Sequence, residues 1–166
     1  MAQKATSLER TSRICGVVAP YQGTTSLTHD DESILETLVQ TAVKKGQKES
    51  YNVFLTVICD DANIHIARCL NQLRAHHPLL HIIALLPDNE SELSSLSARI
   101  AFEQVETYAD EVIRPHRPIE DYPLYAALYC DSLKVCSFGN PQFMSALRED
   151  LSYIHTACSV EQIKKI

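Results

Sequence analysis

Two aspartates and an asparagine stand where an apolar run gives way to a helical pattern. Asp60, Asp61 and Asn63 follow the run Tyr51–Ile58 and precede or begin an amphipathic segment. A carboxylate at this junction can cap the helix, because it accepts hydrogen bonds from the first backbone N–H groups. It can equally accept a sugar hydroxyl or bind Mg²⁺. Direct cradling of a phosphate is disfavoured, because two carboxylates repel an anion and no glycine permits close approach. We favour a cap for one aspartate and leave ligand contact open for the other.

A second polar group follows the first apolar run of the chain. It combines a glycine, an amide and three hydroxyls that can present donors to an anion: Gln22, Gly23, Thr24, Thr25 and Ser26. The segment lacks the spacing and the lysine of a Walker loop. Its alternative interpretation is an ordinary polar connection.

A third group is basic. Arg114, His116 and Arg117 follow the short apolar segment Glu111–Ile113. Two guanidinium groups and an imidazole can grip a phosphate or a carboxylate. A solvated charged loop is the alternative. We therefore consider Gln22–Ser26, Asp60, Asp61, Asn63 and this basic group as candidate ligand-binding residues.

The remaining reactive side chains do not form a recognisable constellation. No HExxH or paired CxxC pattern occurs, and we expect no metal and no cofactor. The six cysteines lie in apolar patterns and are expected to be reduced thiols. Cys59 precedes a predicted helix, a position that lowers a thiol pKa, but Asp60 and Asp61 oppose that effect. We expect no cysteine nucleophile.

Apolar periodicity places these groups between alternating strands and helices. The expected strands are Arg13–Ala19, Tyr51–Ile58, Leu79–Leu86, Glu111–Ile113 and Ser132–Ser137. The first expected helix is capped by Thr28 or by Asp30-Asp31 and ends near Gly46. The other expected helices cover Ala62–His76, Ser91 or Glu92 to Tyr108, Leu124–Cys130 and Gln142–Leu151. No element is assigned to residues 152–166.

This alternation predicts an α/β fold, doubly wound and Rossmann-like. We expect a mostly parallel sheet of about five strands with helices on both faces. Residues 12–166 are expected to form one domain, preceded by a flexible leader over residues 1–11. Ligands of such sheets bind at the carboxyl ends of the strands. The three polar groups above are therefore expected at one edge.

Composition excludes several classes of protein. A net charge of −6 and 7% aromatic residues disfavour a nucleic-acid-coating protein. The longest apolar runs fall short of the ~20 residues that a membrane span requires. The polar first residues show no apolar signal core. We expect a cytoplasmic protein without nucleic-acid or membrane partners.

The order of motifs resembles the SLOG superfamily of Rossmann-like nucleotide-binding proteins, and in particular its YpsA-type branch. The matching pieces are Lys45-Gly46, FLTVICDDANIHIARCL, HPLLHIIALLP, ETYADEVI and YCDSLKVCSFGN, within residues 13–140. The resemblance implies a nucleotide site at the turn after the second strand. Here Asp60 and Asp61 replace the glycines of that turn, and Ala19-Pro20-Tyr21 follows the first strand.

Two functions follow as hypotheses. The first is a ligand-binding or sensing domain for a nucleotide-like or small anionic metabolite, with a remodelled site. The second is a non-catalytic protein–protein interaction module, or a homo-oligomer, in which the tyrosine-rich stretch Tyr122–Tyr129 forms an interface or a core helix. An enzyme ranks third. A hydrolase acting on a nucleotide or its glycosidic bond would require an activated carboxylate from Asp60, Asp61 or Glu90.

Overall fold

A computed structural model describes residues 13–23, 25–93, 95–138, 142–154 and 157–164. The leader expected over residues 1–11 lies outside the described residues. The strands are β1 (Ile14–Val18), β2 (Val53–Val57), β3 (His81–Leu85), β4 (Glu111–Ile113), β5 (Ser132–Cys136) and β6 (Ser159–Ile163). The α-helices are α2 (His29–Lys48), α3 (Asp61–Leu73), α4 (Leu96–Tyr108), α5 (Tyr122–Tyr125) and α6 (Phe143–Ile154). Three 3₁₀ turns are η1 (Glu90–Glu92), η2 (Ile119–Asp121) and η3 (Ala126–Leu128).

The six strands form one sheet in the order β4-β3-β2-β1-β5-β6. Every neighbouring pair is parallel. The chain winds outward from β1 to β4 and then returns to β5 on the other side of β1. This topology confirms the predicted doubly wound α/β fold. The sheet is one strand wider than expected, because β6 lies in the segment to which no element was assigned.

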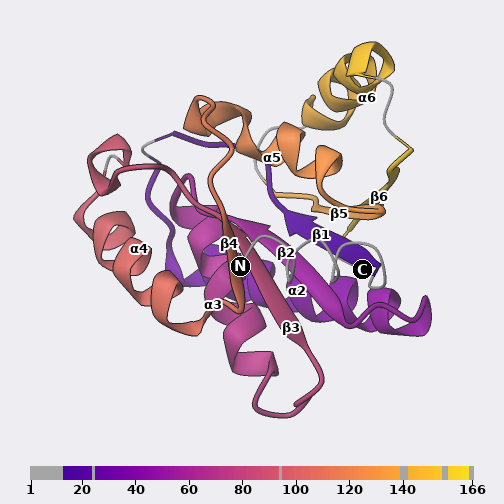
Figure 1. The fold of residues 1–166 in the computed structure, drawn as a ribbon, viewed down its shortest axis with the longest axis horizontal. Coiled ribbons are helices and arrows are strands. Elements are labelled where there is room, and N and C mark those ends of the chain that lie inside the picture. The colour runs from indigo at the N-terminus through magenta and orange to yellow at the C-terminus, as the bar shows by residue number, and fades with distance from the viewer. Residues whose placement is uncertain (1–12, 24, 94, 139–141, 155–156, 165–166) are drawn as a thin grey trace.

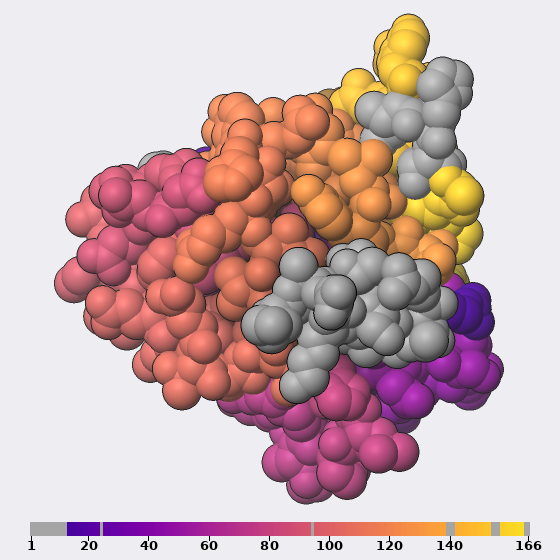
Figure 2. Space-filling view, in the orientation of Figure 1, coloured from indigo at the N-terminus to yellow at the C-terminus, as the bar shows by residue number. Residues whose placement is uncertain are grey.

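Alternating side chains divide the core between the two faces of the sheet. Phe54 and Ile82 pack against α2 and α3 on one face. Leu55 and Leu133 pack on the opposite face, where Tyr122 of α5 belongs to the same cluster. Helix α4 packs beside α3. Figure 1 shows α4 and α6 on opposite sides of the molecule, and in Figure 2 α6 projects from its body.

Helix α2 forms as the sequence predicts. Thr28 accepts a hydrogen bond from Asp31 N, and the Asp31 side chain accepts one from Thr28 N, which makes a capping box. The helix ends near Gly46, as predicted, but continues two residues beyond it, to Lys48. A Cβ on Gly46 would lie 2.9 Å from the Phe54 ring. Glycine is required there because α2 approaches the sheet closely.

Other boundaries also differ. Helix α4 begins at Leu96, where Ser95 accepts a hydrogen bond from Ala98 N, and the separate turn η1 covers the expected start at residues 91–92. Helix α3 ends at Leu73 and not at His76. The expected helix 124–130 is α5 followed by η3. Each difference arises where a local turn or cap competes with continued apolar periodicity.

A buried lysine connects α2 to the far edge of the sheet. Lys134 on β5 has a side chain that is 2% exposed, and its Nζ donates to Glu49 Oε1 at 2.9 Å and to Glu161 Oε1 at 2.7 Å. Lys45 also pairs with Glu161. Hydrogen bonds from Lys134 and Lys45 lower the pKa of Glu161. This network fastens β6 and the end of α2 to the central sheet.

Candidate functional site

The Asp60 carboxylate is turned onto the protein itself. Its Oδ1 accepts hydrogen bonds from Asn63 N at 3.0 Å and Asn63 Nδ2 at 2.9 Å, while Oδ2 accepts one from Gln22 N at 2.6 Å. The residue is 3% exposed. Burial raises the pKa of Asp60, and the bonds from Asn63 and Gln22 oppose that rise. Asp60 is therefore the N-cap of α3, and it also holds Gln22 of the loop that follows β1, which we call the first loop.

Asn63 adds a second connection between the start of α3 and the end of β1. Its Oδ1 accepts from Ala19 N at 2.9 Å, and its Nδ2 donates to Ala19 O at 3.0 Å. The side chain is fully buried. Asn63 and Asp60 thus join the end of β1 to the start of α3. The structure brings these predicted residues together, but as mutual hydrogen-bond partners.

Asp61 and the first loop have separate contacts. Asp61 Oδ1 accepts from Ser95 Oγ at 3.0 Å, and so links the starts of α3 and α4. Gln22 Nε2 donates to Phe138 O at 3.3 Å, and Gly23 has a φ of +63°. Thr25 and Ser26 are exposed, whereas Thr24 lies outside the described residues.

The three basic residues contact different segments. Arg114 donates to Pro87 O at 2.5 Å and to Glu106 Oε2 at 3.0 Å. His116, at a φ of +58°, has its Nδ1 2.9 Å from Asp88 Oδ2. The Arg117 guanidinium lies 4.2 Å from the centre of the Tyr125 ring. Among the described residues, no hydrogen bond joins this group to Asp60 or to the first loop.

Several acidic side chains lie near the carboxyl ends of the strands. Burial raises the pKa of Tyr21, and the nearby acidic groups Asp60 and Glu120 raise it further. Glu106 pairs with Arg114, and Asp88 contacts the His116 ring. An anionic ligand at this site would therefore have to compete with these carboxylates for the basic side chains.

Cys59 has the properties of a core residue. It is 2% exposed, and burial, followed by the Asp60 charge, raises its pKa well above the usual value for a thiol. A thiol needs ionisation to act as a nucleophile, so Cys59 is poorly suited to that role. In the described part of the chain, no three His, Cys, Asp or Glu side chains are placed to hold a metal ion.

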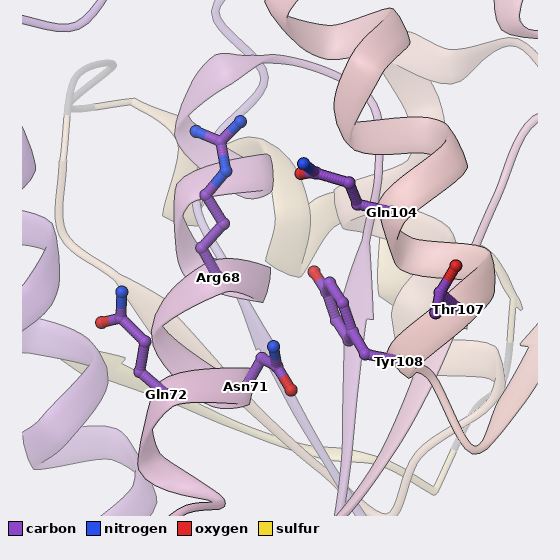
Figure 3. A pocket seen from close by; sticks show the side chains of 6 residues that line it. All are labelled: Arg68, Asn71, Gln72, Gln104, Thr107 and Tyr108. Atoms are coloured by element: carbon purple, nitrogen blue, oxygen red, sulfur yellow. The ribbon is translucent and has the colours of Figure 1, made fainter.

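A polar groove that the sequence reasoning missed lies between α3 and α4 (Figure 3). Its volume is about 440 Å³. Figure 3 shows Arg68 rising from α3, with Gln104 and Tyr108 reaching toward it from α4. The lining comes from two triplets with the same i, i+3, i+4 spacing, which places each triplet on one helix face: Arg68, Asn71 and Gln72, and Gln104, Thr107 and Tyr108. That repeated spacing on consecutive helices was the available sequence signal.

Arg68 is the cation of this groove. Within the described residues it makes no hydrogen bond or ion pair, in contrast to Arg74, which bonds Asp110 Oδ2 and Tyr108 O. Burial raises the pKa of Tyr108 to about 12, although Arg68 and Arg74 act to lower it. Tyr108 therefore presents a neutral hydroxyl near Arg68, whose N–H donors have no acceptor among the described residues.

No protein-family model matches the chain, and a search of curated proteins found no match. The resemblance to the SLOG superfamily therefore stays a prediction. None of the helices in the described ranges is both long and apolar enough to cross a membrane.

Proposed function

We propose that the chain is a non-catalytic interaction module on a nucleotide-binding-like fold, and that it docks a partner segment bearing a carboxylate between α3 and α4. The observation that carries this proposal is the Arg68 guanidinium, which lies in the groove without an acceptor among the described residues. A guanidinium binds a carboxylate through two parallel N–H bonds. The amides of Asn71 and Gln104 add polar contacts around it.

The closed state of Asp60 supports this choice over the strand edge. Both oxygens of Asp60 already accept hydrogen bonds from Gln22 and Asn63. A ligand hydroxyl at that position would have to displace one of them. A SLOG-like ancestor that lost its phosphate turn is consistent with this arrangement.

An apolar ridge beside the groove favours a polypeptide partner over a small metabolite. Leu96 is 74% exposed and Ile100 is 50% exposed. They are spaced i, i+4 on α4 and continue to Gln104 in the groove, so the three side chains lie along one stripe of the helix. A segment that places an apolar side chain on the ridge and an Asp or Glu against Arg68 would satisfy both features.

A peptide array tests this proposal. The full chain is applied to arrayed 12-residue peptides of varied sequence, together with Arg68→Gln and Arg148→Gln, a control in α6. We expect the bound peptides to be enriched in Asp or Glu near an apolar residue. Arg68→Gln should no longer bind these peptides, whereas Arg148→Gln should bind them as the wild type does. Binding without acidic enrichment, or unaffected by Arg68→Gln, would contradict the proposal.

A small anionic metabolite at the strand edge is a second candidate function. It is favoured by Arg117, which forms no ion pair among the described residues, and by the left-handed conformation of its neighbour His116. Melting temperatures measured with nucleotides and sugar phosphates test it. A ligand-induced rise that disappears in Arg114→Ala/Arg117→Ala but survives in Arg68→Gln would support this candidate over the groove.

A further inference from the structure

Two thiols from distant parts of the chain lie in contact at the amino ends of β5 and β6. Cys130 Sγ is 3.7 Å from Cys158 Sγ. Each cysteine stands one or two residues before its strand, and Ser132 pairs with Ser159 in the parallel register. Ser159 N also donates to Asp131 O at 3.0 Å. Backbone pairing of the two strands therefore fixes this contact.

The two thiols are placed differently. Cys130 Sγ donates to Ala126 O at 3.1 Å and packs against Gly16, where a Cβ would come within 3.1 Å of the sulfur. Cys158 is half-buried, as is Cys130, whereas the other four cysteines are buried. Cys130 also lines a cavity of about 380 Å³ together with Leu128. A small disulfide reagent thus has space beside Cys130, and Cys158 is itself partly exposed.

The geometry suits disulfide formation with little movement. A disulfide bond is about 2.05 Å long, so the sulfurs must approach by roughly 1.7 Å from their 3.7 Å separation. Rotation of one side chain covers such a distance. The single Cys130 proton can turn from Ala126 O to Cys158 Sγ, and that hydrogen bond lowers the pKa of Cys158, which favours Cys158 as the attacking thiolate.

We propose that Cys130 and Cys158 form a reversible dithiol–disulfide pair that exchanges with small-molecule disulfides such as oxidised glutathione. The Cys158 thiolate attacks one sulfur of the reagent, whose S–S bond breaks and releases one thiolate that takes up a proton. Cys130 then loses its proton to solvent and attacks Cys158 Sγ in the mixed disulfide, releasing the second thiolate. Two protein thiols are oxidised and one disulfide is reduced to two thiols.

The bond would close the segment from Cys130 to Cys158, which contains β5 and α6. A crosslink that restricts the unfolded chain stabilises the folded one. The oxidised protein is therefore expected to melt at a higher temperature than the reduced protein.

The test incubates the full chain in buffers of increasing ratio of oxidised to reduced glutathione. Remaining thiols are then alkylated, and proteolytic peptides are analysed by mass spectrometry. We expect a Cys130–Cys158 crosslink that lacks two hydrogens and disappears with dithiothreitol. Cys130→Ser should stop at a glutathione adduct on Cys158, and the control Cys69→Ala should still form the crosslink.

Three results of the same experiment would overturn the proposal. They are thiols of the folded wild-type chain that stay reduced at every ratio, a glutathione adduct that never resolves, and a crosslink through another cysteine. Because each is scored on the wild-type chain, a variant that fails to fold does not obscure the answer.

Discussion

Asp60 Oδ1 and Asn63 Nδ2 lie 2.9 Å apart, and the same nitrogen of Asn63 lies 3.0 Å from Ala19 O. These hydrogen bonds join the polar residues that follow β1 to those that follow β2. In a nucleotide-binding sheet, those groups would face a ligand. Here they satisfy one another and hold the first loop against α3.

Replacing Asp60 with alanine is expected to lower the free energy of unfolding by about 2–3 kcal/mol. The change removes the α3 cap and leaves the N–H of Gln22 without its acceptor. Asp60→Asn should cost about half as much, because its amide keeps the cap but presents a donor to Gln22 N–H. Urea denaturation followed by circular dichroism measures both values.

The neighbouring Asp61→Ala serves as the control for this prediction. Its carboxylate is half-buried and accepts one side-chain hydrogen bond from Ser95, so the loss should stay below about 1 kcal/mol. Equal effects of the two alanine variants would show that Asp60 has no special structural role.

The Lys134 network should make stability depend on pH. The folded pKa of Glu161 is lowered from its usual 4.5, so its contribution is fully present above that value. The contribution is lost as the pH falls through the lower folded pKa. We expect Glu161→Gln to cost about 1 kcal/mol at pH 7 and progressively less toward pH 3. Unfolding curves of both proteins across this range measure the difference.

Lys134→Met provides the complementary variant. It removes the buried ammonium itself and leaves Glu49 and Glu161, which are partly exposed to water. Deleting a buried charge costs less than leaving it without its partners. Lys134→Met should therefore cost less than Glu49→Ala/Glu161→Ala. The reverse order would contradict the claim that the buried Lys134 ammonium depends on both carboxylates.

Gly46→Ala tests the close approach of α2 to the sheet. Alanine favours a helix by about 1 kcal/mol over glycine, but its Cβ would lie 2.9 Å from Phe54 and 3.3 Å from Cys15 Sγ. We expect a net loss of about 1 kcal/mol, because overpacking outweighs the gain in propensity. In a Phe54→Leu background the same change should become less costly or favourable. A stabilising Gly46→Ala in the wild-type chain would refute the packing explanation.

The fold could be predicted from the sequence because its strands are short, apolar and separated by amphipathic helices. Leu55 and Phe54 are buried on opposite faces, as a strand covered on both sides requires. The strand β6 was missed because Ser159, Glu161 and Gln162 interrupt its apolar pattern. Its place depends on the pairing of Glu161 with Lys134, which is a contact between distant residues.

The candidate site was harder to predict from the sequence. The cap at Asp60 followed from local rules, but the sequence does not reveal that Gln22 and Ala19 supply the other partners. The sequence predicts Arg114 as a possible ligand contact but does not reveal its pairing with Glu106 from the preceding helix. Conversely, the sequence analysis does not single out Arg68. Its lack of a partner in the described structure appears only when α3 and α4 lie side by side.

A charge reversal tests the proposed function most directly. The measurement is fluorescence anisotropy of an acidic peptide selected on the wild-type chain, bound to wild type and to Arg68→Glu. A second peptide carries Arg in place of its acidic residue. We predict that Arg68→Glu weakens binding of the acidic peptide at least about tenfold, and that the Arg peptide recovers most of this loss on the variant. Equal binding of the acidic peptide to both proteins, or no recovery with the Arg peptide, would contradict docking at the α3–α4 groove.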